Sequence, residues 1–142
     1  MSSISLQSLL TPEKVVEVDY PGFDGFKLKI AFLSREEIVK IRKKCTLTKF
    51  DKKSRQPVDE LDEELFLKTY VSAILKGWKG LKYRYLQELM LVDLTSVEDV
   101  EKELEYTQDN ALVLMKNSQE LDSFVTEITG SLTNFMKYSS QT

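Results

Sequence analysis

Two short segments near the start of the chain alternate between apolar and polar residues. In residues 14–20, Val16 and Val18 fall on one face, and residues 26–33 continue the alternation more strictly. A period of two is typical of a strand with one buried face. Between the segments lies the run Pro-Gly-Phe-Asp-Gly at 21–25, whose residue types favour a turn. The pattern predicts a β-hairpin that needs helices to cover its apolar face.

The period changes to three or four residues after this hairpin. Ser34 is followed three positions later by Glu37, the spacing of an N-terminal capping box. Ile38, Ile41 and Cys45 then share one face, and three basic residues precede the cysteine, as suits the C-terminal end of a helix dipole. The sequence therefore predicts a helix from about Arg35 to Lys44, with a buried thiol at its end.

The rest of the chain is predicted to be mostly helical. The expected elements are a short strand at 46–50, an exposed basic loop at 51–56 that Pro57 ends, helices at 59–76, 81–91, 109–116 and 120–137, a turn at 77–80, and one short helix after Ser96. Asn117 and Ser118 supply the break and cap between the last two helices, and Gly130 weakens the final helix near its middle.

Composition places these elements in one domain. The chain has 142 residues, 42% of them apolar, and a net charge of −3. We predict a mainly helical α+β domain over 13–138, with the N-terminal hairpin packed on a helical bundle and frayed ends at 1–12 and 139–142. No apolar run is long enough to cross a bilayer, and the start lacks a signal-peptide pattern, so we expect a soluble cytoplasmic protein without a membrane partner.

The residues offer little for catalysis. The chain has no histidine and a single cysteine, which excludes a Ser-His-Asp triad, a His-assisted thiol and histidine-containing metal sites. The acidic run 59–64 lacks the glycine-bearing calcium-loop pattern and is explained by a helix N-terminus, and no phosphate-binding glycine loop occurs. We expect no catalytic, cofactor or metal site, and hence a protein that is not an enzyme.

Three features could serve binding, each with a simpler structural reading. The run 76–85 interleaves basic and aromatic residues, as in a nucleic-acid surface. Alternatively it is a turn that Trp78 anchors against the core, or Trp78 and Tyr83 bind a protein partner. The basic loop 49–55 either docks an acidic partner or is a solvated tip. Residues 1–58 carry a balance of +5 and residues 59–142 one of −8, which favours head-to-tail self-association or reflects two solvated faces.

Several of these segments together resemble a known family, the tail assembly chaperones of long-tailed, siphovirus-type bacteriophages. The similarity spans about residues 13–137 and depends on the order and spacing of short motifs, with no single diagnostic box. The motifs are the run from Tyr20 to Glu37, Lys43-Lys44-Cys45, Thr48-Lys49-Phe50-Asp51, Trp78-Lys79-Gly80-Leu81-Lys82, Tyr106, Asn110-Ala111, Leu114-Met115-Lys116-Asn117-Ser118 and the helix that carries Phe124.

The resemblance implies a non-enzymatic role in tail morphogenesis. Such chaperones bind and solubilise the tape measure protein, help to recruit tail tube subunits, in some cases through a longer frameshift product, and leave before the tail is finished. We therefore expect a late protein of the host cell cytoplasm that self-associates and is absent from the mature virion. The residues expected to contact the tape measure protein or a neighbouring copy are Trp78, Tyr83, Leu121, Phe124 and Phe135.

Two other functions fit the same residues. One is a structural tail completion or connector protein of the virion. The other is a small nucleic-acid adaptor that uses residues 76–85, although the net negative charge argues against nucleic acid as the partner.

Overall fold

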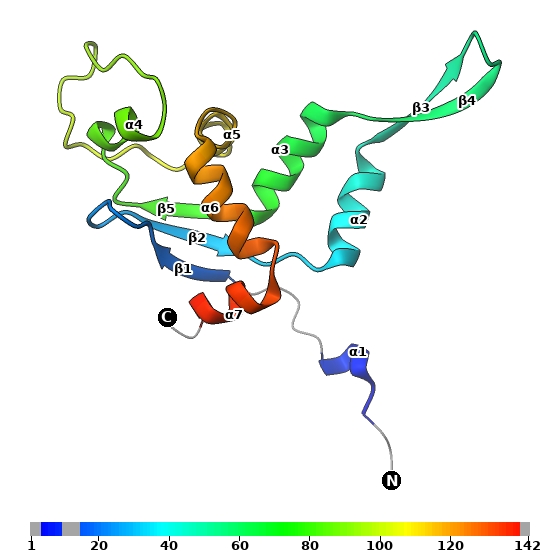
Figure 1. The fold of residues 1–142 in the computed structure, drawn as a ribbon, viewed down its shortest axis with the longest axis horizontal. Helices are drawn as coiled ribbons and strands as arrows, with labels where there is room; N and C mark the ends of the chain where they lie inside the picture. Colours follow the sequence, from blue (N-terminus) through cyan, green and yellow to red (C-terminus); the bar gives the residue numbers. More distant parts are fainter. Residues whose placement is uncertain (1–3, 10–14, 140–142) are drawn as a thin grey trace.

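An antiparallel three-stranded sheet organises the core of the computed structural model, which describes residues 4–9 and 15–139 (Figure 1). Its strands are β1 (Val15–Asp19), β2 (Lys27–Ala31) and β5 (Leu75–Lys79), in the order β1-β2-β5. The predicted hairpin is confirmed. Val16 pairs with Ile30 and Val18 with Leu28, and all four side chains are buried, because their alternation puts them on one face.

The structure describes the two ends of the chain only in part. Of the two ends predicted to fray, residues 1–3, 10–12 and 140–142 fall outside the described residues. Between the first two groups, α1 (Leu6–Leu9) forms a single exposed helical turn.

The third strand, β5, lies where the sequence predicts the end of a helix at 75–76 and a turn at 77–80, so this prediction is wrong. Helix α3 (Glu63–Ile74) stops at Ile74, and four of the next five residues pair with β2, where Trp78 lies opposite Leu28. Strand β2 is central and buried, so its second edge would otherwise hold unpaired backbone groups. Hydrogen bonds to these backbone groups stabilise the fold more than further turns of α3 would. The turn follows at Gly80, where φ is +75°.

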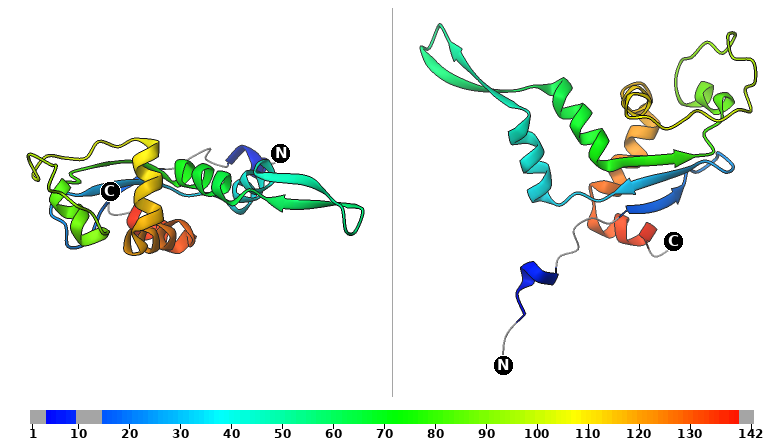
Figure 2. Two further views of the ribbon diagram at one scale, coloured as in Figure 1. Left: turned by 90° about the horizontal axis from the view of Figure 1, so that it is seen from above. Right: turned by 180° about the vertical axis from the view of Figure 1, so that it is seen from behind.

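A second pair of strands forms a long arm that projects from the body (Figures 1 and 2). The predicted strand at 46–50 is confirmed as β3 (Thr46–Asp51), which leads out of α2 (Arg35–Lys44). Its partner β4 (Gln56–Leu61) contains Pro57 and Asp59, which were expected to end a loop and begin a helix; both expectations are wrong. Pairing with β3 keeps the backbone in an extended conformation as far as Leu61.

Both helices at the base of the arm begin at a side-chain cap. Ser34 accepts a hydrogen bond from the Glu37 backbone N–H at 3.2 Å, as the capping-box spacing predicts. In α3 the cap is Asp62, whose Oδ1 accepts from the Leu65 N–H at 3.1 Å. The helix therefore begins four residues later than predicted.

The C-terminal half supplies the remaining helices. They are α4 (Tyr83–Leu89), α5 (Gln108–Asn117), α6 (Gln119–Thr129) and α7 (Leu132–Ser139). Of these, α6 packs against β2 and α7 against β1. Ser118 caps α6 as predicted, accepting from the Leu121 N–H at 3.3 Å. Residues 90–107 form a long loop of turns, and the helix expected after Ser96 is absent from this described segment.

The single helix predicted at 120–137 is broken in two at Gly130. The Gly130 N–H donates to the Thr126 carbonyl at 2.7 Å, and a Cβ at this position would lie 2.8 Å from the same oxygen. The chain then reverses so that α7 packs on β1, and the Phe135 ring lies 5.3 Å from that of Phe32. Burying the apolar face of α7 on the sheet accounts for the break.

The fold class is α+β, as predicted. The core lies between the inner face of the sheet and the helices, and its fully buried side chains include Phe26, Ile74, Leu81, Leu121 and Val125. The outer face of the sheet is charged, with Lys79 and Glu17 paired at 3.2 Å. Among the described helices, none combines the length and the apolar character that a membrane span requires.

Candidate protein-binding surfaces

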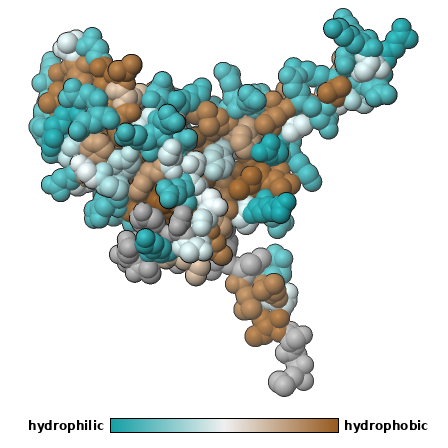
Figure 3. All heavy atoms as spheres, in the orientation of Figure 1, coloured by the Kyte–Doolittle hydropathy of each residue, from teal (hydrophilic) through white to brown (hydrophobic). Residues whose placement is uncertain are grey.

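The β3–β4 arm is the first candidate surface, because most of its residues are exposed in the described part of the chain. Six residue pairs join its strands, which makes the arm roughly 20 Å long at about 3.4 Å per residue. Leu47 is 49% exposed, Phe50 67% and Val58 45%, and brown patches interrupt the teal surface of the arm (Figure 3). A lone two-stranded hairpin is marginally stable in water. An arm of this kind is suited to stabilisation by another protein.

The register of the arm gives each face an apolar and a polar part. Residues that pair across antiparallel strands share a face. One face carries Leu47 and Val58 beside an ion pair between Lys49 and Glu60, whose Nζ and Oε2 are 3.1 Å apart. On the opposite face Phe50 stands next to Pro57. The two faces can therefore contact different partners.

The tip of the arm is a positively charged turn. Asp51 holds the turn, since its carboxylate accepts hydrogen bonds from the Lys53 N–H and the Ser54 hydroxyl, each at 3.0 Å. These bonds hold the pKa of Asp51 below its usual value. Lys52, Lys53 and Arg55 are exposed around this one carboxylate. Arg55 has a φ of +55°, a conformation that glycine or asparagine adopts more easily.

A groove at the opposite end of the molecule is the second candidate surface. It has a volume of about 740 Å³ and lies between the β1–β2 turn, α4 and one face of α6. Aromatic side chains from Tyr20, Phe23 and Phe124 line it, and three glutamates surround them, Glu88, Glu120 and Glu127. The lining contains no lysine or arginine. The groove therefore combines an apolar floor with negative charge.

The aromatic floor is tightly packed. The Tyr20 ring centroid lies 5.1 Å from Phe23 and 4.9 Å from Phe124, and Phe23 also lies 5.0 Å from Tyr85. Burial raises the pKa of the Tyr20 hydroxyl, and the negative charge of Glu120 adds to this effect. Tyr20 is buried, whereas Phe23 and Phe124 are partly exposed and form the accessible floor.

The five residues predicted to bind partners lie in two different environments. Trp78, Leu121 and Phe135 are at most 8% exposed and pack in the core of their own chain. Tyr83 is partly buried at the start of α4, and Phe124 lines the groove. The structure does not bring the five together. The helical stripe in the sequence identified core positions. The sequence predicts the first strand of the arm but assigns the region of β4 to a loop and a helix, so the arm as a whole was missed.

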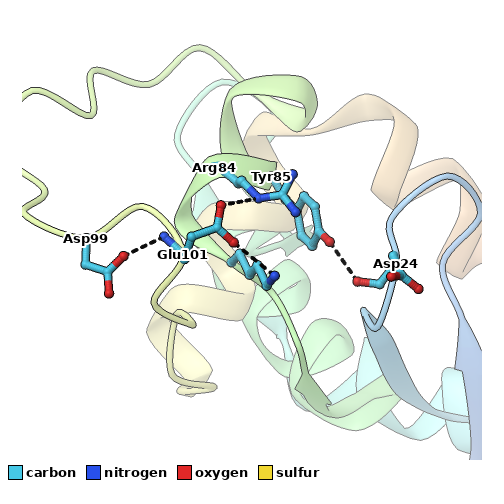
Figure 4. A network of polar contacts seen from close by, with 6 residues as sticks. Asp24, Arg84, Tyr85, Asp99 and Glu101 are labelled. Carbon is cyan, nitrogen blue, oxygen red and sulfur yellow. Dashed lines mark hydrogen bonds and ion pairs between the residues drawn. The ribbon is translucent and has the colours of Figure 1, made fainter.

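The basic-aromatic run 76–85 presents little of either character to a ligand. Lys79 pairs with Glu17, while Lys82 Nζ and Arg84 Nε lie 3.0 Å and 2.7 Å from the Glu101 carboxylate (Figure 4). Both cations hold the pKa of Glu101 below its usual value, with the Lys82 hydrogen bond contributing most. Lys79, Lys82 and Arg84 thus face carboxylates of the same chain.

The aromatic side chains of the run hold neighbouring segments in place. The Tyr85 hydroxyl donates to the Asp24 carbonyl at 2.7 Å (Figure 4), and the Trp78 indole Nε1 donates to the Leu104 carbonyl at 2.9 Å. Tyr106 fixes the same loop by donating to the Leu75 carbonyl at 2.6 Å. These bonds satisfy the polar atoms of Trp78 and Tyr85, whose side chains are otherwise buried among apolar neighbours.

The candidate chemical groups are placed as follows. Cys45 is fully buried, and its Sγ donates a weak hydrogen bond to Thr69 Oγ1 at 3.8 Å. The acidic run 59–64 is divided between β4 and the start of α3. Over residues 4–9 and 15–139, no three histidine, cysteine, aspartate or glutamate side chains are grouped so as to hold a metal ion.

These features define a small α+β protein with a projecting β-arm and an acidic aromatic groove. A family model described as YdaY prophage protein matches residues 33–142, and the chain belongs to this family. Comparisons with curated proteins and with solved structures find no match. The family confirms the phage origin that the resemblance implied; the role in tail assembly stays a prediction.

Proposed function

We propose that this phage protein is a non-enzymatic tail assembly chaperone, which binds and solubilises the tape measure protein in the host cell cytoplasm. The tail tube protein is a second partner in this proposal, reached through a longer frameshift product. The observation that carries the proposal is the exposed Leu47–Val58 face of the arm, which no other element covers among the residues that the structure describes.

The arm suits a long apolar helix as its client. Apolar surface removed from water contributes roughly 25 cal/mol per Å², so covering such a helix opposes its aggregation. The binding face needs shape and apolar area but no reactive group. Leu47 and Val58 are each about half exposed and lie diagonally opposite one another across the two strands. The Lys49–Glu60 pair beside them keeps the free arm hydrated.

Co-expression with the tape measure protein tests the proposal. We expect the soluble fraction of the tape measure protein to rise severalfold when this chain is present. The double variant Leu47→Ser/Val58→Ser should remove most of that gain. Val113→Ser is the matched control, because Val113 is 51% exposed on α5 and lies outside the arm. If the tape measure protein is equally soluble with and without the chain, the proposal is wrong.

Analysis of purified virions separates the chaperone from a structural tail protein. A chaperone leaves before the tail is complete, so mass spectrometry of mature particles should not detect this chain. Its recovery in a fixed ratio to the tail tube protein would overturn the proposal in favour of a completion or connector protein. Salt-dependent retention on DNA that Lys79→Glu abolishes would instead support the nucleic-acid adaptor.

A further inference from the structure

We propose that copies of this protein associate head to tail, with the arm tip of one copy seated in the acidic aromatic groove of the next. The tip is the turn from Lys52 to Arg55 together with Phe50. The groove is lined by Tyr20, Phe23, Phe124, Glu88, Glu120 and Glu127. The occupant of the groove is thus a second copy of this chain.

Charge complementarity selects this occupant. The tip carries three cations around one carboxylate, and the groove carries three carboxylates and no cation in its lining. In the described part of the chain, neither Lys52 nor Lys53 forms an ion pair, and the same holds for Glu88 and Glu120. Their charges therefore remain available to a neighbouring copy. Complementary potentials steer association and fix its register.

The apolar groups match as well. Phe50 is 67% exposed beside the basic turn, and Phe23 and Phe124 form an accessible aromatic floor between the glutamates. Aromatic rings pair favourably with centroids about 4.5–7 Å apart, and lysine or arginine binds over aromatic faces. An aromatic side chain flanked by cations is therefore the ligand that this groove fits.

The two surfaces lie too far apart to meet within one molecule. The arm points away from the sheet at one end, and the β1–β2 turn that lines the groove lies at the other end (Figure 1). Contact between two different patches is a heterologous interface, which leaves one free arm and one free groove at the ends of every assembly that does not close into a ring. Association can thus extend beyond a dimer. Because Phe50 and Pro57 lie on the face opposite Leu47 and Val58, a docked tip leaves the proposed client-binding face uncovered.

Sedimentation equilibrium of the purified protein tests this proposal without any client, so its outcome is independent of the proposed chaperone function. We expect the average mass to rise with concentration at about 50 mM NaCl and to fall at about 500 mM, because salt screens the charges. The tip variant Lys52→Glu/Lys53→Glu and the groove variant Glu88→Lys/Glu120→Lys should each weaken association at least about tenfold. The control is Glu98→Lys/Lys102→Glu in the exposed loop 90–107, which should associate as the wild type does.

Mixing the variants gives the sharpest result. The tip variant keeps a working groove and the groove variant keeps a working tip, and the reversed tip and the reversed groove are complementary to each other. An equimolar mixture should therefore recover association, with the two variants alternating along the assembly. A chain with all four reversals should associate again, because both surfaces have changed sign. Circular dichroism and melting curves verify that each variant is folded.

Two results would overturn the proposal. One is a wild-type protein that stays monomeric at every concentration. The other is self-association that neither reversal weakens, which would place the interface elsewhere on the molecule.

Discussion

Gly80 gives a stringent test of the packing between the β1–β2 turn and the end of β5. Its φ is +75°, and a Cβ there would lie 1.9 Å from the Gly25 carbonyl oxygen and 2.7 Å from the carbonyl carbon. Both neighbours are backbone atoms, which cannot rotate away. Gly80→Ala must therefore shift the turn that precedes buried Phe26.

The expected loss can be separated into two parts. A side chain at positive φ costs about 1–2 kcal/mol. Displacing packed backbone adds about 1–3 kcal/mol, as in other overpacked sites. Together Gly80→Ala should lower the free energy of unfolding by about 2–5 kcal/mol, a large part of the roughly 5–15 kcal/mol typical of a domain. Gly22 provides the control, because its φ is +88° and nothing lies within 4 Å of its added Cβ.

Urea denaturation followed by circular dichroism measures both variants. Gly22→Ala should show only the conformational part, and the difference between the variants should be about 1–3 kcal/mol with unchanged m-values. Equal losses in Gly80→Ala and Gly22→Ala would refute the close approach between Gly80 and the turn.

Three further predictions concern stability. Trp78→Phe removes the indole hydrogen bond to the loop 90–107 and should lower the free energy of unfolding by about 1–3 kcal/mol; an unchanged value in urea denaturation would contradict this role. Ser118→Ala should cost about 1 kcal/mol through loss of the α6 cap, whereas Ser123→Ala, on the exposed side of α6, should cost little in the same assay. Burial raises the pKa of the Tyr20 and Tyr106 hydroxyls above their usual value of about 10, so the stability that they contribute is complete below that pH and is lost as the pH rises further. Urea unfolding between about pH 8 and about pH 11 should show the decline, and a flat profile would contradict it.

Prediction from the sequence succeeded where the information is local. The β1–β2 hairpin follows from its alternation, and the caps at Ser34 and Ser118 follow from a hydroxyl that reaches a backbone N–H three residues ahead. Each needs only neighbours along the chain. The basic charge of the 49–55 segment was likewise visible, and it remains at the arm tip in the structure.

The candidate surfaces were predicted only in part. Phe124 is predicted to contact a partner as one member of a helical stripe, and the structure places it in the lining of the groove. The carboxylates around it come from α4 and α6, so their convergence depends on how these helices pack. Trp78 read as a surface aromatic because a basic residue flanks it on one side and a glycine on the other; its burial follows from its place in the sheet.

The sequence by itself determined the elements whose residues repeat with one clear period, together with the mixed α+β class and the lack of histidine chemistry. Only the tertiary structure decided segments that suit more than one conformation. Residues 75–79 became a strand because β2 offered an unpaired edge, residues 56–61 because β3 lay beside them, and the last helix broke at Gly130 because α7 could then cover β1. Backbone pairing and apolar burial are contacts between distant residues, and no local pattern specifies them.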